Sequence, residues 1–227
     1  MPHPTPATLK SHPLRLGHRG ARSVRSIPEN SIASFDRALA DGCDGFEFDV
    51  RLTEDEEAVV CHDPHVDGIE IAQASAAQLP ALPRLRDVLE RYRDRAFLDI
   101  ELKVQGLETI TIDLLAKFPP RRGFVISSFV PSVLQTLYVE NPALPLGLIC
   151  ELPDELADWP RLPVSYVVPQ HTLLTSALLA EIHAAGKKIL VWTVNSAAAM
   201  IRFRDLGVAG MISDRTELLC RTLPSPR

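Results

Sequence analysis

A chain of 227 residues that is 46% hydrophobic and 23% charged has the size and composition of one globular domain. Its formal net charge of −5 argues against a non-specific nucleic-acid binder, and no block of Lys and Arg suggests a membrane-surface patch. No apolar stretch reaches the ~18 residues of a membrane helix, so we expect no stable membrane insertion. The sequence carries no prediction of oligomeric state.

The N-terminal segment and the cysteines bear on the cellular compartment. Residues 1–13 begin Met1-Pro2-His3-Pro4 and lack the apolar core of a secretory signal, so we predict a flexible tail stiffened by proline. The cysteines are scattered and form no CxxC pair: Cys43, Cys61, Cys150 and Cys220. This pattern favours buried free thiols in a reducing compartment, and we predict a cytoplasmic protein.

Apolar, β-branched runs alternate with helical patterns along most of the chain. The candidate strands are residues 14–17, 45–52, 58–62, 97–102, 124–127, 146–150, 166–168, 188–194 and 208–212. Helix candidates are residues 31–40, with Asn30 or Ser31 as the N-cap, residues 175–185, ending at Gly186, and residues 196–206, ending at Gly207.

The alternation of strands and helices predicts a parallel sheet, and about eight such units predict a closed TIM-type (β/α)8 barrel. An open doubly wound sheet is the alternative, but no GxGxxG turn follows the first strand. The barrel is predicted to span residues 14–221, with residues 63–84 as a short irregular insertion.

Nine candidate strands are one more than this barrel needs. Only residues 53–57 separate the second candidate from the third, whereas a parallel crossover needs a dozen or more residues. We therefore predict an antiparallel hairpin that adds one strand outside the ring. A two-residue turn at Asp55-Glu56 would place Asp49 opposite His62.

Acidic side chains are paired on two candidate barrel strands. Glu47 and Asp49 are two residues apart and share one strand face, and Asp99 and Glu101 repeat this pattern. Adjacent carboxylates repel unless a cation or a proton lies between them. We predict that Glu47, Asp49 and Glu101 bind one divalent cation, Mg²⁺ or Ca²⁺, because oxygen ligands favour hard ions. Glu101 is preferred to Asp99 because it is closer to the exit of its strand.

Two histidines end apolar runs near these carboxylates. His18 and His62 can each act as general acid or general base near neutral pH. Arg19 can bind two phosphate oxygens, or it can form a salt bridge with Glu29. Lys103, on the same strand face as Glu101, is a second candidate for phosphate binding. Asp63 can orient a loop or accept a hydrogen bond.

Aromatic residues near strand ends have a structural and a functional interpretation. Trp192 lies in a late candidate strand and Phe129 follows Ser127-Ser128. Either ring can pack in the core, or it can stack on the apolar face of a small polyol at the barrel mouth.

Six motifs in order closely resemble the glycerophosphodiester phosphodiesterase family. They are His18-Arg19-Gly20, Pro28-Glu29-Asn30-Ser31, Glu47-Phe48-Asp49-Val50, His62-Asp63, Glu101-Leu102-Lys103 and Trp192-Thr193-Val194-Asn195. The resemblance extends from Leu14 to Leu218. It implies a TIM-type barrel, a divalent metal on Glu47, Asp49 and Glu101, and His18 and His62 as the acid–base pair. It also implies Arg19 and Lys103 at the phosphate and Glu29 near the metal or substrate.

The resemblance implies hydrolysis of a glycerophosphodiester to glycerol 3-phosphate and an alcohol such as choline or ethanolamine, by a cyclic phosphate or by direct attack of water. Two departures from the family are visible. The insertion after His62-Asp63 is short, which predicts a reduced or absent cap and an open mouth, and Glu56 replaces the glycine of the family's Asp-Gly turn. The open mouth leaves a lysophospholipid or sugar phosphodiester as alternative substrates. A non-catalytic barrel that binds phosphorylated ligands is the alternative outside enzymes.

Overall fold

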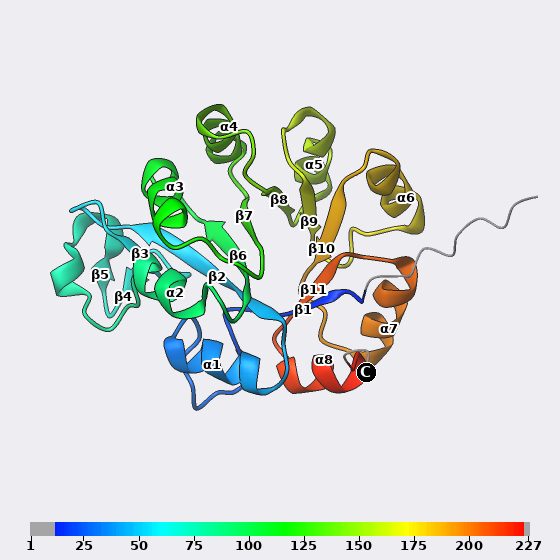
Figure 1. Ribbon diagram of the computed structural model, residues 1–227, viewed down its shortest axis with the longest axis horizontal. Coiled ribbons are helices and arrows are strands. Elements are labelled where there is room, and N and C mark those ends of the chain that lie inside the picture. The colour runs from blue at the N-terminus through cyan, green and yellow to red at the C-terminus, as the bar shows by residue number, and fades with distance from the viewer. Residues whose placement is uncertain (1–11, 225–227) are drawn as a thin grey trace, which may run out of the picture.

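A computed structural model of the protein describes residues 12–224, so nearly all of the predicted tail, residues 1–13, lies outside the described residues. Eight parallel strands form a barrel (Figure 1): β1 (Leu14–Gly17), β2 (Gly45–Leu52), β6 (Phe97–Leu102), β7 (Phe124–Ser128), β8 (Leu146–Cys150), β9 (Tyr166–Pro169), β10 (Lys188–Val191) and β11 (Gly210–Ser213). β1 pairs with both β2 and β11, which closes the ring. The predicted TIM-type barrel is confirmed.

Helices surround the ring on its outer side (Figure 1): α1 (Ile32–Ala40), α2 (Leu85–Tyr92), α3 (Glu108–Lys117), α4 (Pro131–Glu140), α5 (Pro153–Leu156), α6 (Ser176–Ala184), α7 (Ala197–Leu206) and α8 (Thr216–Thr222). Ser31 is the N-cap of α1, because its side chain accepts a hydrogen bond from the Ser34 N–H. Gly207 ends α7 at φ +80°, a conformation that glycine adopts at little cost. Among the described residues, no helix is long and apolar enough to cross a membrane.

The extra strand β3 (Ala58–Val60) pairs antiparallel with β2, as predicted. The register differs from the prediction by one residue, because the Cys61 N–H, not that of His62, donates to the Asp49 carbonyl. The two-residue turn was wrong: Thr53 N–H donates to the Glu57 carbonyl, and the loop holds Glu56 at φ +60°. His62 nevertheless lines the same cavity as Glu47, because it lies beyond the end of β3.

The insertion between β3 and α2 is not irregular throughout. It contains a second sheet of β4 (His65–Val66) and β5 (Ile69–Glu70) and two 3₁₀ helices, η1 (Ile71–Gln73) and η2 (Ala76–Gln78). Asp67 and Gly68 both have positive φ and form the turn between the strands. An Asp-Gly pair is a strong hairpin signal that the sequence prediction missed. A small cap is therefore present beside β3 and α2 (Figure 1).

Strand alternation separates the outer core from the barrel interior. Phe46 and Phe48 point outward, and Phe46 stacks on Phe35 of α1 with ring centroids 4.2 Å apart. The interior holds a smaller apolar cluster: Leu16, Phe97, Val125, Ile149, Tyr166, Val168, Leu190 and Ile212. Because successive residues of a strand face opposite sides, Glu47 and Asp49 must point into the barrel.

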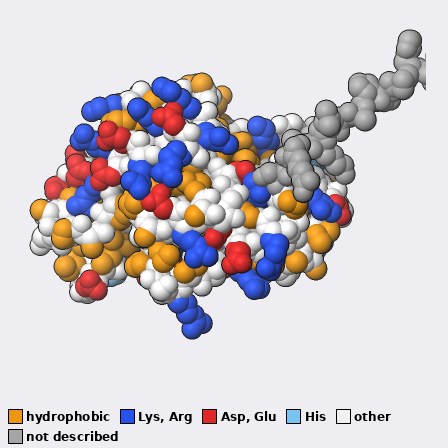
Figure 2. Space-filling view, turned by 60° about the horizontal axis from the view of Figure 1, so that its bottom comes forward, with side chains coloured by type: hydrophobic (Ala, Val, Ile, Leu, Met, Phe, Trp, Pro, Cys, Tyr) orange, Lys and Arg blue, Asp and Glu red, His pale blue; other side chains and the backbone are white. Residues whose placement is uncertain are grey.

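Charged side chains of both signs are interspersed on the face shown in Figure 2, with hydrophobic side chains between them. A third 3₁₀ helix, η3 (Trp159–Arg161), connects α5 to β9. Cys43, Cys61, Cys150 and Cys220 are free thiols, and Cys43 and Cys150 are buried.

Candidate active site

A cavity of about 370 Å³ opens at the carboxyl ends of the barrel strands. One side is polar and is lined by His18, Arg19, Glu47, His62, Asp99, Glu101 and Lys103. The other side is mostly apolar and is lined by Phe129, Ile149, Glu151, Val168, Trp192 and Ile212. Of the nine residues predicted for the site, seven line this cavity, and Asp49 belongs to the carboxylate cluster described below. The ninth, Glu29, does not line the cavity but contacts Arg19.

The three predicted metal ligands are brought together by strand register. β2 and β6 are parallel neighbours, with Glu47 paired to Asp99 and Asp49 paired to Glu101. Glu47, Asp49 and Glu101 are buried, and each has a carboxylate oxygen within 4.8 Å of the other two. Asp99 lies one step deeper and accepts a hydrogen bond from Ser127 Oγ at 2.6 Å. This geometry agrees with the preference for Glu101 over Asp99.

Burial of Glu47, Asp49 and Glu101 close to one another shifts the pKa values of their carboxyl groups. Burial and the charges of Asp49 and Glu101 raise the pKa of Glu47 well above its usual range. Burial and Asp49 raise the pKa of Glu101 to about 7. For Asp49, the effect of burial is outweighed by Lys103, Arg19 and Asn30, and its pKa is lowered.

The cluster has the donor set of a site for a hard divalent cation. Glu47 Oε1 and Asp49 Oδ1 are buried and have no hydrogen-bond partner among the described residues. A cation coordinated by these oxygens would relieve both the repulsion between the acids and the missing hydrogen bonds. The residues therefore fit the predicted cofactor.

Asn30 positions Asp49 and was not predicted as a site residue. Its Nδ2 donates to Asp49 Oδ2 at 2.8 Å, and its Oδ1 accepts from the Asp49 N–H at 3.3 Å. The backbone at Asn30 has φ +55°, which asparagine tolerates better than most residues. The sequence pattern allowed Asn30 to be a helix cap, but Ser31 has that role.

Arg19 contacts three carboxylates at the site. Its backbone N–H donates to Glu47 Oε2 at 2.9 Å. Its guanidinium group lies 2.7 Å from Glu29 Oε1 and 3.3 Å from Asp49 Oδ2. Arg22 contacts the other oxygen of Glu29 at 2.7 Å. Burial lowers the pKa of Arg19, but the neighbouring carboxylates outweigh it and the pKa is raised. Glu29 thus orients two arginines, and both interpretations offered for Arg19 are compatible with the structure.

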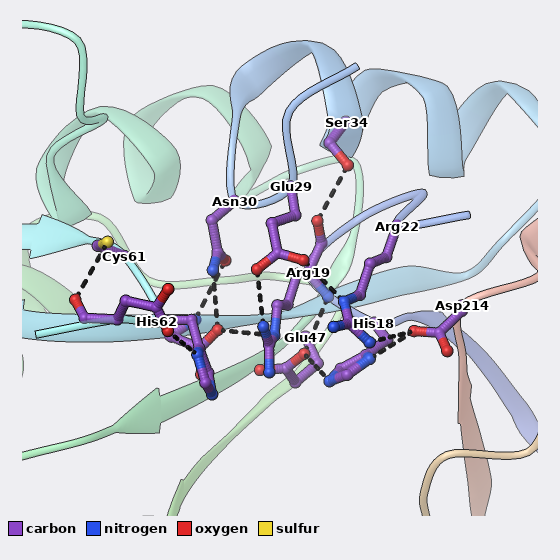
Figure 3. Close-up of polar contacts among 12 residues, drawn as sticks. His18, Arg19, Arg22, Glu29, Asn30, Ser34, Glu47, Cys61, His62 and Asp214 are labelled. Carbon is purple, nitrogen blue, oxygen red and sulfur yellow. Dashed lines mark hydrogen bonds and ion pairs between the residues drawn. The ribbon is translucent and has the colours of Figure 1, made fainter. Parts of the chain in front are cut away.

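His18 is held by an aspartate that the sequence prediction missed. His18 Nδ1 lies 2.7 Å from Asp214 Oδ1, and the opposite ring atom, Nε2, lies 3.9 Å from Glu47 Oε2 (Figure 3). Asn195 Nδ2 donates to Asp214 Oδ2 at 2.7 Å. Burial would raise the pKa of Asp214, but the contact with His18 outweighs it and lowers the pKa to about 2. Its position two residues after the last candidate strand, residues 208–212, was the available signal.

His62 lies on the other side of Glu47 from His18 (Figure 3). Its Nδ1 lies 2.7 Å from Asp63 Oδ1, and its side chain is 34% exposed. Asp63 therefore takes the hydrogen-bonding role that was one of its two interpretations. The two imidazoles approach the cavity from opposite sides, each with a carboxylate on Nδ1.

Lys103 and the two aromatic rings complete the cavity wall. Lys103 Nζ donates to Glu101 Oε1 at 2.6 Å, lies 3.4 Å from Asp49 Oδ1, and lies 5.5 Å from the centre of the Phe129 ring. Phe129 and Trp192 meet edge to face, with centroids 5.8 Å apart. Trp192 Nε1 donates to the Val168 carbonyl at 2.8 Å, which fixes its ring. Both rings line the cavity and are not simply core residues.

The sequence model of the glycerophosphoryl diester phosphodiesterase family matches residues 18–218. The chain belongs to this family. A glycerophosphodiester phosphodiesterase from Caldanaerobacter subterraneus subsp. tengcongensis is 30% identical over 236 residues, which cover 91% of this chain and 96% of that protein. The family predicted from the six motifs is confirmed, and with it the prediction of an enzyme of the phosphodiesterase class.

Solved structures agree with the fold. The crystal structure of a glycerophosphodiester phosphodiesterase from Parabacteroides distasonis has a TM-score of 0.82 and 25% identity, covering 94% of this chain and 98% of that one. A phosphodiesterase from Oleispira antarctica, solved in complex with the product sn-glycerol-3-phosphate, has a TM-score of 0.82, 23% identity and the same coverage.

Proposed function

We propose that this protein hydrolyses glycerophosphodiesters to glycerol 3-phosphate and an alcohol, with a divalent cation as cofactor. The observation that carries the proposal is the meeting of two histidines and three buried carboxylates at one cavity in a chain of this family. The names of the relatives support the substrate class, and the Oleispira antarctica neighbour was solved with glycerol 3-phosphate. The free thiols support the predicted cytoplasmic location.

Glu47, Asp49 and Glu101 would hold the cation, and Mg²⁺ or Ca²⁺ suits their oxygen ligands. When bound, such an ion supplies positive charge that stabilises the charge developing on the phosphoryl oxygens. Asn30 contributes by fixing Asp49, since it contacts both the carboxylate and the backbone of that residue.

The two histidines would move the protons. A carboxylate can only accept hydrogen bonds, so Asp214 holds the proton of His18 on Nδ1 and leaves Nε2 free to take or give a proton at the cavity. Asp63 has the same relation to His62. Because the two rings lie on opposite sides of Glu47, one can remove the proton of the nucleophile while the other protonates the leaving oxygen.

Arg19 and Lys103 would position the phosphate. Both of these positively charged side chains contact the carboxylate cluster and line the cavity, so a phosphate next to the cluster lies within their reach. Trp192 and Phe129, on the opposite wall, provide apolar surface for the organic part of the substrate. Glu29 acts through Arg19, which it holds at 2.7 Å.

Turnover of glycerophosphocholine in the presence of Mg²⁺ or Ca²⁺ tests the proposal, with glycerol 3-phosphate measured enzymatically. Phosphorus NMR during the reaction separates a cyclic phosphate from direct hydrolysis. Formation of glycerol 3-phosphate that stops on chelation supports the proposal. Failure to release it with either cation from any glycerophosphodiester would contradict it and favour a binding protein.

The small cap supports a second candidate activity, on lysophospholipids. The cap consists of one short hairpin and two 3₁₀ helices, and Ile69 on it is exposed. Comparison of glycerophosphocholine with lysophosphatidylcholine as substrates distinguishes the two activities.

A further inference from the structure

One carboxylate stands apart in the mostly apolar half of the cavity. Glu151 follows β8 directly and lines the cavity with Phe129, Val168 and Trp192. It is the only charged residue among the described residues that line that half. The four acids Glu47, Asp49, Asp99 and Glu101 belong to the opposite, polar half, as do Arg19 and Lys103.

The Glu151 carboxylate is available to a ligand. It is exposed, and no hydrogen bond or ion pair joins its side chain to another described residue. Its backbone is fixed instead, because the N–H groups of Glu151 and Leu152 both donate to Glu155 Oε2, at 2.8 and 3.0 Å. The Glu155 carboxylate adds negative charge to this rim of the cavity, but its Oε2 already accepts these two hydrogen bonds.

The ring of Trp192 offers an apolar surface to a cation on the same wall. Its orientation is fixed by the bond from Nε1 to the Val168 carbonyl. Phe129 is less suited to this role, because the Lys103 ammonium already lies 5.5 Å from its centre. An aromatic face and an unpaired carboxylate together attract an alkylammonium group.

We propose that Glu151 and Trp192 form a subsite for a cationic leaving alcohol, an alkylammonium alcohol such as choline or ethanolamine, and that Glu151 makes the enzyme prefer it to an uncharged alcohol. The proposal rests on the proposed function and refines its substrate class. The phosphate lies on the polar half of the cavity, and the leaving group extends from it towards the β8 rim.

The test compares kcat/KM for three substrates: glycerophosphocholine, glycerophosphoethanolamine and glycerophosphoglycerol, whose leaving alcohol is uncharged. We expect Glu151→Gln to lower kcat/KM about two- to fivefold for the two cationic substrates, as for an exposed ion pair, and to leave the uncharged substrate unchanged. Glu151→Lys should deepen the loss for the cationic substrates. Glu181→Gln, which removes an exposed charge on α6, is the matched control and should change none of the three.

The outcomes of this test distinguish failure of the Glu151 subsite from failure of the proposed function. An equal loss for all three substrates would show a structural role for Glu151 and overturn the subsite, and so would no change for any of them. Wild-type turnover of at least one substrate sustains the proposed function in either case. A wild-type protein that hydrolyses none of the three with Mg²⁺ or Ca²⁺ overturns the proposed function and the headgroup preference with it.

A separate observation concerns two cysteines at the other end of the barrel. The Sγ atoms of Cys43 and Cys220 lie 3.6 Å apart although 177 positions separate them. Cys43 is buried just before β2, and Cys220, on α8, is half-buried. The contact with Cys43 lowers the pKa of Cys220, with a further contribution from Arg15. α1 and α8 lie side by side there, below the ring in Figure 1.

We infer that Cys43 and Cys220 form a reversible disulfide when they meet a disulfide oxidant such as oxidised glutathione. The Cys220 thiolate attacks one sulfur of glutathione disulfide and releases one glutathione thiolate. The contact with Cys220 and burial raise the pKa of Cys43, so the Cys43 thiol gives up its proton as it attacks Cys220 Sγ. This attack releases the second glutathione as a thiolate; both protein thiols have then lost a proton, and one Sγ–Sγ bond has formed. The bond would connect the first and the last helical units of the barrel.

Peptide mapping of the protein after treatment with oxidised glutathione tests this inference. We expect a linked pair of peptides that contain Cys43 and Cys220, a higher melting temperature, and reversal of both by dithiothreitol. Cys220→Ser should lose the linked pair, whereas the control Cys61→Ser should keep it. Glutathione attached to Cys220 without a link to Cys43, or two unmodified thiols, would overturn the inference.

Discussion

His18 Nδ1 lies 2.7 Å from Asp214 Oδ1, and this contact joins the residue after the first barrel strand to the residue after the last. The two strands are parallel neighbours with Gly17 paired to Ser213, so the next residues of both meet at the mouth. Asn195 and Arg22 also contact Asp214, which limits its movement. Closure of the barrel therefore brings His18 and Asp214 together.

Asp214→Asn should lower kcat roughly 10- to 10³-fold, because an amide can present its NH₂ group to His18 and favour the wrong tautomer. Steady-state turnover of glycerophosphocholine measures the loss. Asp113→Asn, an exposed aspartate on α3, is the control and should keep full activity. Full activity of Asp214→Asn would remove the pair from the mechanism.

Asp214 should also make the stability of the folded protein depend on pH in the acidic range. Its pKa is about 2 in the folded protein, below the value of about 4 for an unfolded aspartate. The stabilisation is therefore complete above about pH 4 and is lost as the pH falls towards 2, and it amounts to about 2 kcal/mol. Urea unfolding at pH 7 and at pH 3 should show that Asp214→Asn is less stable than wild type, by a margin that narrows at pH 3. A margin that does not change with pH would contradict the assigned pKa.

His18→Ala and His62→Ala should each lower kcat by roughly 10²–10⁴-fold if the two rings transfer protons. The loss should appear in kcat more than in KM, since the rings act on protons in the transition state. His183→Ala changes an exposed histidine on α6 and serves as the control. A variant that turns over at the wild-type rate with cation present would exclude that histidine.

Glu47→Gln should abolish stabilisation by cations without destabilising the cation-free protein. Burial and the neighbouring acids raise the pKa of Glu47, so a neutral amide relieves repulsion there. Wild type should gain about 2.7 kcal/mol of stability at a cation concentration of 100 times Kd. Melting temperatures with and without Mg²⁺ or Ca²⁺ test this. Equal shifts in both proteins would place the ion elsewhere.

Glu56→Gly should stabilise the protein by up to about 1 kcal/mol, because Glu56 has φ +60° and a left-handed conformation strains a residue with a Cβ atom. Denaturant unfolding measures the gain. Glu54→Gly is the control in the same loop, and since Glu54 has no positive φ, that change should be neutral or destabilising. A loss of stability in Glu56→Gly would show that the side chain contributes more than the backbone costs.

Local patterns were sufficient to locate the eight barrel strands and the side of each strand that carries acids, although some predicted ends were wrong, as for residues 188–194, where β10 ends at Val191. Glu47 and Asp49 had to share a face because the strand repeat is two residues, and Phe46 and Phe48 had to face the helices. The short link between β2 and β3 excluded a parallel pair. The one-residue error in register arose because Thr53 and Glu57 close a longer loop, and the turn chemistry there is unusual.

The sequence by itself determined the alternation of strands and helices, the acids and histidines at strand ends, and the family, because each is written in local spacing. Only the tertiary structure decided that Asp214 holds His18, that Asn30 holds Asp49, and that the Glu151 carboxylate has no partner among the described residues. These relations join residues that are far apart in the chain or depend on what surrounds a side chain. The register of a closed barrel sets them, and a linear pattern of residues does not contain that register.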